Sequence, residues 1–470
     1  MKKSQTCRAI AFAATAALCG AAYGQTPTAE ALVSKLVEKG ILTDAEAKQV
    51  MGEAAQTNRA PASKWKLNDA VKSLGLYGDV RFRYEYRSAE NAPGSGQSGS
   101  TYYRSRLRYS VRVGIQGDLF DDFYYGLRIE TGSNPRSPWV TFGDDTNPTP
   151  SAKNSDGVSI GQAFLGWRPA TWLDLTLGRM PMPLVVTPMI WDADIQPEGA
   201  AEKFKCAFQD VDLFATFGQF LYQDSNSNNE FPAGNPFLLA WQLGANVKVS
   251  QDKAFKVAPV FYTYTGFGQN NGLNQSFSGQ GSGGLNPNTP GFNQNGINDL
   301  LILEVPAEFN FSLAGYRARI FGDFAFNFSG DNRARAAAAA TAPAGNLPYP
   351  VTGQNTAYQL GLGYGNLGLV YGQTSKRNTW EGRVYWQHIE QYAADVNLLD
   401  SDFLEGRANL QGVYVAFTYS FTDAILGTVR YGYAQLINPK LGTGGNNSDL
   451  YILNPINYYN LFQFDVTCRF

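Results

Sequence analysis

The sequence predicts an all-β protein: a transmembrane antiparallel β-barrel of sixteen strands, preceded by a short N-terminal helical segment. Three observations predict this fold. From residue 74 onwards, apolar and polar residues alternate with a period of two, and the connections between the alternating segments are short and long in turn. In addition, only 17% of the 470 residues are charged and 14% are aromatic, whereas ordinary globular proteins carry roughly 25% charged residues.

The overall composition excludes several classes of protein. The mean hydropathy is −0.27, and after the N-terminus no run approaches the ~20 apolar residues of a membrane-spanning helix. The formal net charge of −2 gives no basis for binding nucleic acid, which attracts strongly basic surfaces. Because the chain has a single His, we expect no His-based metal site or catalytic triad, and no cofactor.

The first residues, 1–24, are predicted to be a signal peptide. A basic start (Lys2, Lys3 and Arg8) precedes an apolar run and a small-x-small cleavage site at residues 22–24. We therefore expect this segment to be removed and the mature chain to be exported.

Residues 25–56 are predicted to form a pair of short helices in the periplasm. Their Leu and Val residues recur at helical spacing, and residues 43–46 (TDAE) form a capping box for the second helix. Residues 57–73 are expected to be a linker to the barrel, which is predicted to span residues 74–470.

The alternation of the strands is clearest in the last eleven residues. Five apolar side chains share one parity and four polar side chains share the other, namely Phe462, Phe464, Val466, Cys468 and Phe470 against Gln463, Asp465, Thr467 and Arg469. Because a strand places successive side chains on opposite faces, this strand has one apolar and one polar face. Residues 76–87 and 103–115 repeat the pattern.

Sixteen segments of this kind are present. We predict strands at approximately 74–87, 102–117, 121–132, 157–168, 171–180, 200–209, 211–222, 237–250, 252–266, 299–312, 314–328, 355–365, 376–391, 407–421, 424–437 and 459–470. Short turns alternate with long loops between them, except around residues 366–376, where the expected short turn is longer.

This pattern is typical of an outer-membrane barrel. Lipid offers no hydrogen-bond partners, so a sheet that spans a membrane must close on itself, with apolar side chains outward and polar ones toward the lumen. The alternative, a secreted soluble β-sandwich, would bury one apolar core and expose fewer aromatic residues. We therefore expect a barrel surrounded by lipid in the cell outer membrane, with the N-terminal segment in the periplasm.

Several stretches of the sequence resemble one family of Gram-negative outer-membrane proteins, the putative porins. They are residues 31–50, 177–201, 322–327 and 398–419. The terminal Phe470 resembles the C-terminal signal that the outer-membrane assembly machinery reads. One departure is that the family tends to carry an amide and an aromatic residue where this chain has Met182 and Leu184. The resemblance implies a passive diffusion channel and, by analogy, a homotrimer, but no particular solute.

The parity of the first three strands assigns eight Arg residues to the lumen: Arg81, Arg83, Arg87, Arg104, Arg106, Arg108, Arg112 and Arg128. Against them stand Asp79, Glu85 and Glu130, and Arg469 on the closing strand joins the same wall. Clustered charges in a confined aqueous pore concentrate counter-ions. One hypothesis is therefore a basic ladder that orients polar solutes and favours anions. The other is that these side chains simply solvate the inner face and pair with nearby carboxylates.

The loop at residues 181–199, between the fifth and sixth predicted strands, carries three acids: Asp192, Asp194 and Glu198. In sixteen-stranded porins the loop at this position folds into the barrel, so the resemblance implies that these carboxylates face the Arg wall across a constriction. Two alternatives stay open. The loop is a solvated surface loop, or it binds Ca²⁺, since clustered carboxylates suit a hard cation.

A second acidic loop, at residues 392–406, contains Asp395, Asp400, Asp402 and Glu405. We expect it to be a solvated extracellular loop, with divalent-ion binding as a weaker hypothesis. Residues 267–298 and 333–345 are of low complexity and are expected to be surface loops.

Three functions compete. The first is a passive porin for ions and small polar solutes. The second is an outer-membrane enzyme, which would depend on His388, a residue with lipid-facing parity and no identifiable Ser partner. The third is a structural or adhesive barrel closed by its own loops, which a conductance measurement separates from the first. The sequence favours the porin.

Overall fold

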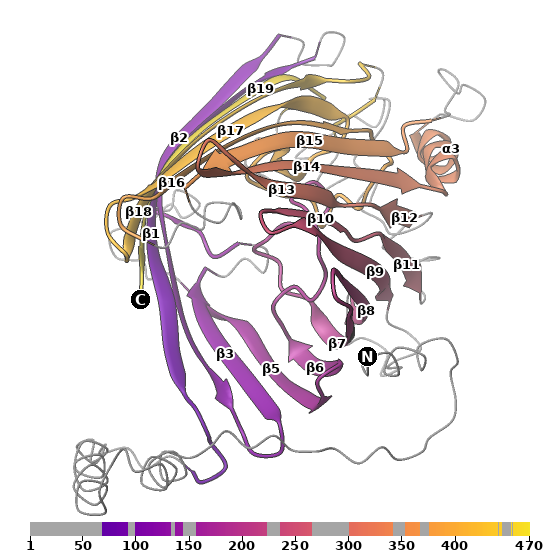
Figure 1. Ribbon diagram of the computed structural model, residues 1–470. Coiled ribbons are helices and arrows are strands. Elements are labelled where there is room, and N and C mark those ends of the chain that lie inside the picture. Colours follow the sequence, from indigo (N-terminus) through magenta and orange to yellow (C-terminus); the bar gives the residue numbers. More distant parts are fainter. Residues whose placement is uncertain are drawn as a thin grey trace, which may run out of the picture. The chain divides into compact units, whose positions relative to one another are not determined.

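The computed structural model describes residues 68–92, 99–132, 137–143, 157–222, 236–265, 300–341, 353–366, 376–439, 441–443, 453 and 455–470. Within residues 72–470 the described strands form one antiparallel sheet that closes into a barrel (Figure 1). The predicted signal peptide, the helical pair and most of the linker lie outside the described residues.

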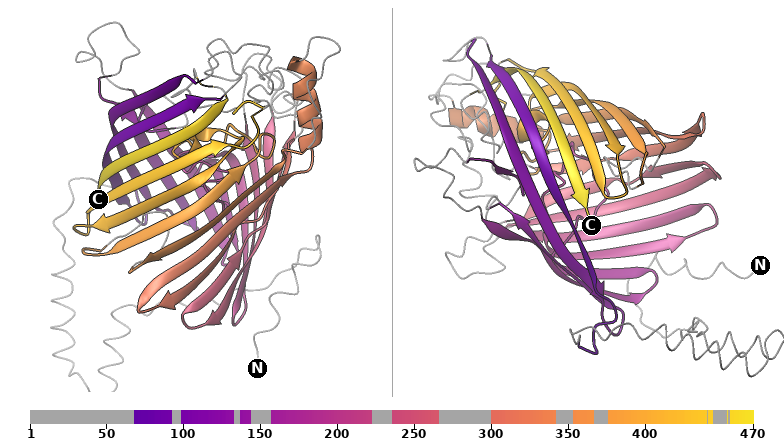
Figure 2. Two further views of the ribbon diagram at one scale, coloured as in Figure 1. Left: turned by 90° about the horizontal axis from the view of Figure 1, so that it is seen from above. Right: turned by 90° about the vertical axis from the view of Figure 1, so that its left-hand side faces the viewer.

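The sheet contains nineteen strand segments in chain order. They are β1 (Gly75–Asn91), β2 (Thr101–Asp118), β3 (Phe123–Thr131), β4 (Val140–Thr141), β5 (Val158–Ala170), β6 (Leu173–Arg179), β7 (Glu198–Ala207), β8 (Val211–Leu221), β9 (Phe237–Ser250), β10 (Lys253–Val257), β11 (Val260–Thr265), β12 (Leu301–Glu304), β13 (Ala307–Leu313), β14 (Tyr316–Asn327), β15 (Thr356–Gly365), β16 (Trp380–Ile389), β17 (Leu410–Ser420), β18 (Ile425–Leu436) and β19 (Ile456–Arg469). β1 pairs along its length with both β2 and β19, so the first and last strands close the barrel. Figure 2 shows the strands tilted along the wall.

These segments make sixteen spanning strands. β10 and β11 pair with successive parts of β9 and are halves of one strand, interrupted at Pro259, and β12 and β13 are halves of the next, interrupted at Pro306. Proline lacks the N–H that a ladder needs, but the Ala258 N–H still donates to the Pro306 carbonyl at 3.0 Å. β4 pairs with β2 beyond the end of β3. The predicted sixteen-stranded closed barrel is confirmed.

Burial alternates along each strand as the sequence pattern predicts. In β1 the outward Phe82 is 52% exposed, whereas the next residue, Arg83, is 3% exposed. Charged and amide side chains therefore fill the inside, and apolar side chains cover the outside, which suits a lipid environment. A soluble sandwich would show the opposite arrangement. Among the described residues, no helix has the length and apolar character needed to cross a bilayer.

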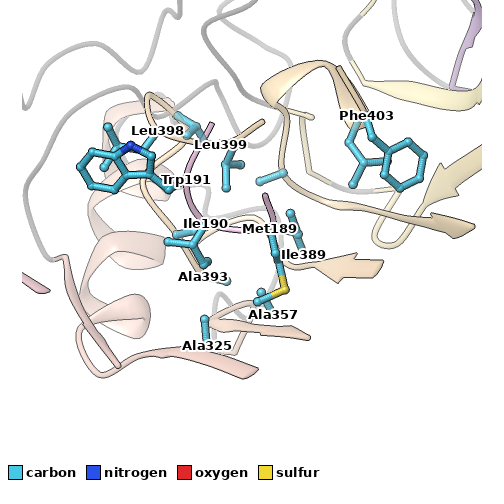
Figure 3. Packing of buried hydrophobic residues seen from close by; sticks show 14 of the residues in the cluster. Met189, Ile190, Trp191, Ala325, Ala357, Ile389, Ala393, Leu398, Leu399 and Phe403 are labelled. Carbon is cyan, nitrogen blue, oxygen red and sulfur yellow. The ribbon is translucent and has the colours of Figure 1, made fainter. Parts of the chain in front are cut away.

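The apolar core lies inside the barrel, where two loops meet the wall (Figure 3). Met189, Ile190 and Trp191 come from residues 180–197, and Leu398, Leu399 and Phe403 come from residues 390–409. They pack against small wall residues, Ala325 and Ala357, and against Ile389 at the end of β16.

Two expectations about the loops are wrong. Residues 392–406 do not form a solvated loop, because the segment is almost entirely buried and its acids have partners inside the barrel. Residues 330–341 form a helix, α3 (Gly330–Thr341), where a low-complexity surface loop was expected from residue 333 onwards. Arg333 and Ala334 on this helix are buried, because one side of it packs against the protein. The run of Ala residues favours helix.

Candidate functional site: the charged interior of the barrel

The structure places all eight predicted Arg residues on the inward-facing positions of β1, β2 and β3. β1 and β2 align so that Arg83 lies opposite Arg108 and Arg87 lies opposite Arg104. A strand period of two keeps every second residue on the inside, so the run of alternating Arg in the sequence becomes one continuous basic wall. The carboxylates that pair with these arginines determine how much positive charge the wall presents to a solute.

Glu85 is the centre of the first set of ion pairs. Its carboxylate accepts hydrogen bonds from Arg106 Nε at 2.7 Å and Arg87 Nη2 at 3.1 Å. Arg108 approaches it to 3.8 Å, and Gln463 on β19 donates to it at 2.9 Å. Glu85 is fully buried, so several guanidinium groups compensate one carboxylate that has no access to water.

Arg83 connects β1 with the last strand and with the second loop. Its guanidinium makes a bidentate pair with Asp465, at 2.8 and 2.9 Å, and also donates to Asp402 at 2.6 Å. Arg430 on β18 pairs with the same Asp465. Trp139 stacks beneath this group, with the Arg83 guanidinium carbon 4.0 Å from its ring centre, which adds a cation–π attraction.

A smaller cluster on the same wall is partly exposed. Asp79 accepts from Arg112 Nε at 2.9 Å, with Arg112 Nη2 2.7 Å from the same carboxylate oxygen, and pairs with Arg81 at 3.0 Å. Arg112 also approaches Asp194 of the first loop to 3.8 Å. These four side chains are 14–23% exposed. Here the wall and the loop bring opposite charges together at a water-accessible surface.

Most of the predicted ladder is therefore paired. Arg128 pairs with its strand neighbour Glu130 at 3.0 Å. A carboxylate also lies within 4.0 Å of Arg81, Arg83, Arg87, Arg106, Arg108 and Arg112. Arg104 lies inward beside Arg87. The geometry agrees with the second hypothesis, in which the wall arginines bind nearby carboxylates.

The first loop, residues 180–197, crosses the interior and is anchored on the opposite wall. The Val185 N–H donates to Gln242 Oε1 at 2.8 Å, and Gln242 Nε2 donates back to the Val185 carbonyl at 2.8 Å. Thr187 donates through its hydroxyl to Asp323 and through its N–H to Glu304 at 3.4 Å. Because β9, β12 and β14 supply these partners, the loop narrows the interior on that side.

The second loop, residues 390–409, is anchored on several strands. Asp395 accepts from the Tyr222 hydroxyl at 2.9 Å and the Tyr264 hydroxyl at 2.7 Å. At the other end, Glu405 pairs with Arg407 at 3.1 Å. Leu404 and Glu405 both have φ of 60°, a left-handed conformation that costs non-glycine residues energy. The buried ion pairs hold this tight turn in place.

The two loops meet at Asp192. Its N–H donates to the Leu398 carbonyl at 2.6 Å, and its carboxylate accepts from both the N–H and the hydroxyl of Ser401, at 3.0 and 2.9 Å. Burial, together with the neighbouring Asp194, raises the pKa of Asp192 to about 7. Burial and the Asp192 carboxylate likewise raise the pKa of Asp400. This pair therefore carries less than its full negative charge at neutral pH.

Asp402 behaves differently from its two neighbours. Burial opposes its ionisation, but the Arg83 and Arg430 guanidinium groups outweigh that effect and hold the pKa of Asp402 well below its usual range. Its side chain is nevertheless 31% exposed. Asp402 is thus an ionised, water-accessible acid that nothing in the sequence places inside the barrel.

The prediction for Glu198 is wrong. The structure places it as the first residue of β7, outside the loop, and pairs it with Arg179. Glu198 shares the outward-facing parity of Phe204, and its side chain is half-exposed. Only Asp192 and Asp194 of the three predicted acids lie in the inward loop, because β7 already begins at Glu198.

The structure also shows two buried acids that the sequence did not single out. Glu304 on β12 and Asp323 on β14 lie close together beneath Thr187, and the Tyr262 hydroxyl donates to Glu304 at 2.6 Å. Their inward parity in the sequence was the available signal. Within the described ranges, no group of three or more His, Cys, Asp or Glu side chains could hold a metal ion.

Comparison with known proteins identifies a family. A family model described as "Putative porin" matches residues 88–322 and 299–470. No curated protein matches the sequence. Among solved structures, a triple mutant of the Rhodopseudomonas blastica porin is similar with 10% identity and a TM-score of 0.40, covering 85% of this chain and 100% of that chain. OmpT, an outer membrane protein of Vibrio cholerae, is similar with 10% identity and a TM-score of 0.41, covering 87% of this chain and 100% of that chain. The family match extends over most of the chain, and the protein belongs to the putative porin family.

Proposed function

We propose that ions and small polar solutes diffuse passively through the interior of this outer-membrane barrel, past the partly exposed cluster of Asp79, Arg81, Arg112 and Asp194. The observation that carries the proposal is the inward-facing charge on every strand of the first wall, together with a loop acid that reaches this charge from inside the barrel. Opposite fixed charges in a narrow aqueous passage produce a transverse field, which orients dipolar solutes and disfavours lipophilic ones.

The exposure of the paired charges supports a preference for anions. Arg430 is 17% exposed, whereas its partner Asp465 is 3% exposed. Arg108 is 13% exposed, whereas Glu85 is 1% exposed. At these two pairs water in the interior therefore meets the guanidinium group more than the carboxylate, whereas at the Arg83–Asp402 pair it meets the carboxylate, which is 31% exposed. The raised pKa of Asp192 reduces the negative charge further. Because most arginines are paired, we expect the preference to be modest.

Single-channel recording in a planar bilayer tests the proposal. The refolded barrel should give stable open steps. In a KCl gradient, the sign of the reversal potential should show that the channel is more permeable to Cl⁻ than to K⁺. Arg112→Gln should move that potential toward cations, whereas Arg377→Gln in an exposed turn should not. Open steps with a preference for cations would support the proposed channel and refute the proposed preference for anions.

A second candidate is a structural or adhesive barrel that its own loops close. The two inward loops favour it, because residues 180–197 and 390–409 bring apolar side chains into the interior, where they pack against the wall. Absence of conductance from a correctly folded barrel would support this function.

We place the N-terminal segment in the periplasm, as the export signal implies, and infer that the assembly machinery reads Phe470, whose side chain is exposed.

A further inference from the structure

Two lysines on β7, Lys203 and Lys205, face the lumen near the end of the barrel where the turns are short. Ala201, which has the same parity, is buried and lies in register with Thr176 on β6. The hydroxyl of Tyr124, from the inward-facing set on β3, lies 2.9 Å from the Thr176 hydroxyl. The odd-numbered residues of β7 therefore point inward. We place this mouth on the periplasmic side, because short turns lie there in outer-membrane barrels.

Unlike most arginines of the first wall, the two lysines have no carboxylate partner among the described residues. Asp174 on β6 is in register with Lys203, but its carboxylate accepts from the Tyr124 hydroxyl at 2.6 Å and from Arg168 Nε at 3.4 Å. Within the described part of the chain, no carboxylate oxygen lies within 4.0 Å of either ammonium group, and neither group makes a hydrogen bond. Two positive charges on successive inward positions are therefore uncompensated.

Water reaches both lysines from the lumen. Lys205 is exposed and Lys203 is partly exposed, so both ammonium groups are accessible to a dissolved ion. Residues two apart in a strand are separated by about 7 Å. The two ammonium groups can therefore contact separate carboxylates of one small solute.

An aromatic ring lies beside the lysines on the inner face. Phe214 on β8 is in register with Lys205 on one side and with Gly244 on β9 on the other. Its ring carbons lie 2.1–2.5 Å from the position that a Cβ at Gly244 would take. Glycine at this position therefore lets the ring lie over the neighbouring strand. Because Phe214 is partly exposed, it offers an apolar contact next to the two charges.

The lysines also lie beside the first inward loop. Thr216 on β8 is in register with Lys203 and with Gln242. Gln242 in turn accepts from the Val185 N–H of the loop at 2.8 Å. Two strand spacings, about 10 Å, separate Lys203 from this anchor. A solute that passes the loop on this side of the barrel therefore meets the lysines.

We propose that Lys203 and Lys205 form a binding site for small dicarboxylates, in which Phe214 contacts the carbon chain between the two carboxylates. Two uncompensated cations match a dianion in charge and can donate charge-assisted hydrogen bonds to it. Arg168 adds no third free cation, because Asp174 and Asp118 approach it to 3.4 and 3.9 Å. The site names a class of solute for the proposed diffusion pathway, and it rests on that proposal only for its role in transport.

Saturation-transfer NMR measures this binding whether or not the barrel conducts. The probe is succinate at about pH 8, where both of its carboxylates are ionised, added to the full-length protein refolded in uncharged detergent micelles. The unmodified protein should bind it saturably. The double substitution Lys203→Gln with Lys205→Gln should raise the Kd about tenfold, because two charge-assisted contacts are lost.

Lys256→Gln is the matched control. Lys256 on β10 also lies on the inner face, in register with Asn246, and among the described residues it too has no carboxylate within 4.0 Å. It lies three strands away from β7 in the sheet, so its substitution should change the Kd less than about twofold. An equal loss from Lys256→Gln would show that succinate responds only to the overall charge of the lumen, and would overturn the site.

Competition identifies the class of anion. Acetate carries one charge and inorganic phosphate has no carbon chain, so each should displace succinate only at about tenfold higher concentration than a second dicarboxylate, glutarate, requires. Phosphate that competes as well as glutarate would overturn the assignment to dicarboxylates. Phe214→Ala should weaken succinate binding severalfold, and an unchanged Kd would remove Phe214 from the site.

Heat-dependent gel mobility shows whether each variant is folded, and Lys205→Gln alone decides if the double variant is not. Succinate binding that survives these substitutions in a folded barrel would overturn the proposal. Single-channel recording separates the site from the pathway. A barrel that binds succinate but gives no open steps would keep the site and refute diffusion, whereas open steps without succinate binding would keep diffusion and refute the site.

Discussion

At the scale of single residues, the interior is organised by carboxylates that are matched to guanidinium groups from distant parts of the chain. Glu85 and Asp465 are buried acids that each serve more than one Arg. A buried ion of this kind is stable only while its partners remain, because removal of one partner leaves an uncompensated charge. Exposed pairs contribute much less.

Glu85→Gln should therefore destabilise the barrel by about 3–5 kcal/mol, since Arg87 and Arg106 lose their common acceptor charge. Glu308→Gln is the control, because Glu308 is partly exposed and has Arg319 as a partner at 3.2 Å. It should cost only about 0–1 kcal/mol. Urea unfolding of the refolded protein in micelles measures both. Equal losses would show that the Glu85 network is not a stabilising centre.

Asp192 should make stability depend on pH. Its pKa is about 7 in the folded protein and roughly 3.9 in an unfolded chain, so the folded state binds more protons between those values. Stability should therefore fall as pH rises from about 4 to about 7. Asp192→Asn should remove this part of the decline, whereas Asp423→Asn in an exposed turn should keep it. Parallel pH profiles for Asp192→Asn and the unmodified protein would contradict the assignment.

At the scale of elements, strands and loops differ in how well the sequence predicted them. The strands were predictable because lipid and water impose a period of two that each strand reveals by itself, as in residues 460–470. The inward position of the loop at 392–406 was not predictable, because acidic residues in a loop are expected to be solvated. The partner that draws Asp402 inward is Arg83, which is 319 positions earlier in the chain. Glu198 was misplaced for a related reason: nothing local marks where β7 begins.

The second loop should narrow the passage. Replacement of residues 392–406 by a Gly/Ser linker of equal length removes the Asp395 and Asp402 anchors and the buried Leu398–Leu399 pair. We expect the single-channel conductance to rise severalfold, with heat-dependent gel mobility confirming a folded barrel. An unchanged conductance from the folded variant would show that solutes do not pass this loop.

At the scale of the whole molecule, the barrel closes at the chain's last residue. The Phe470 N–H donates to the Gly78 carbonyl at 3.1 Å, and the Gly78 N–H donates to the Phe470 carbonyl at 2.9 Å. The strand count and the closure were predictable from alternation and loop lengths. The filled interior was not, because it depends on two loops meeting at Asp192 and Ser401, more than 200 positions apart.

Deletion of Phe470 should reduce the amount of barrel assembled in the outer membrane by about tenfold, if the assembly machinery reads this residue. Refolding of the same variant into micelles should change little, because only the last backbone pair is lost. Phe470→Tyr, which keeps an aromatic terminus, is the control. Equal losses in cells and in micelles would assign Phe470 a purely structural role.

The pairing of Arg83 with Asp465 has a consequence for the order of biogenesis. The two residues are separated by 382 positions, and Arg430 and Gln463, which complete the network, also come from the last two strands. A growing sheet that lacks these strands holds Arg83 without Asp465. Pairing of the final hairpin with the first strand brings the two charges together, after most of the loop-closure entropy has been lost. The pairing of β1 with β19 is thus the step at which an open assembly intermediate becomes committed to the closed barrel.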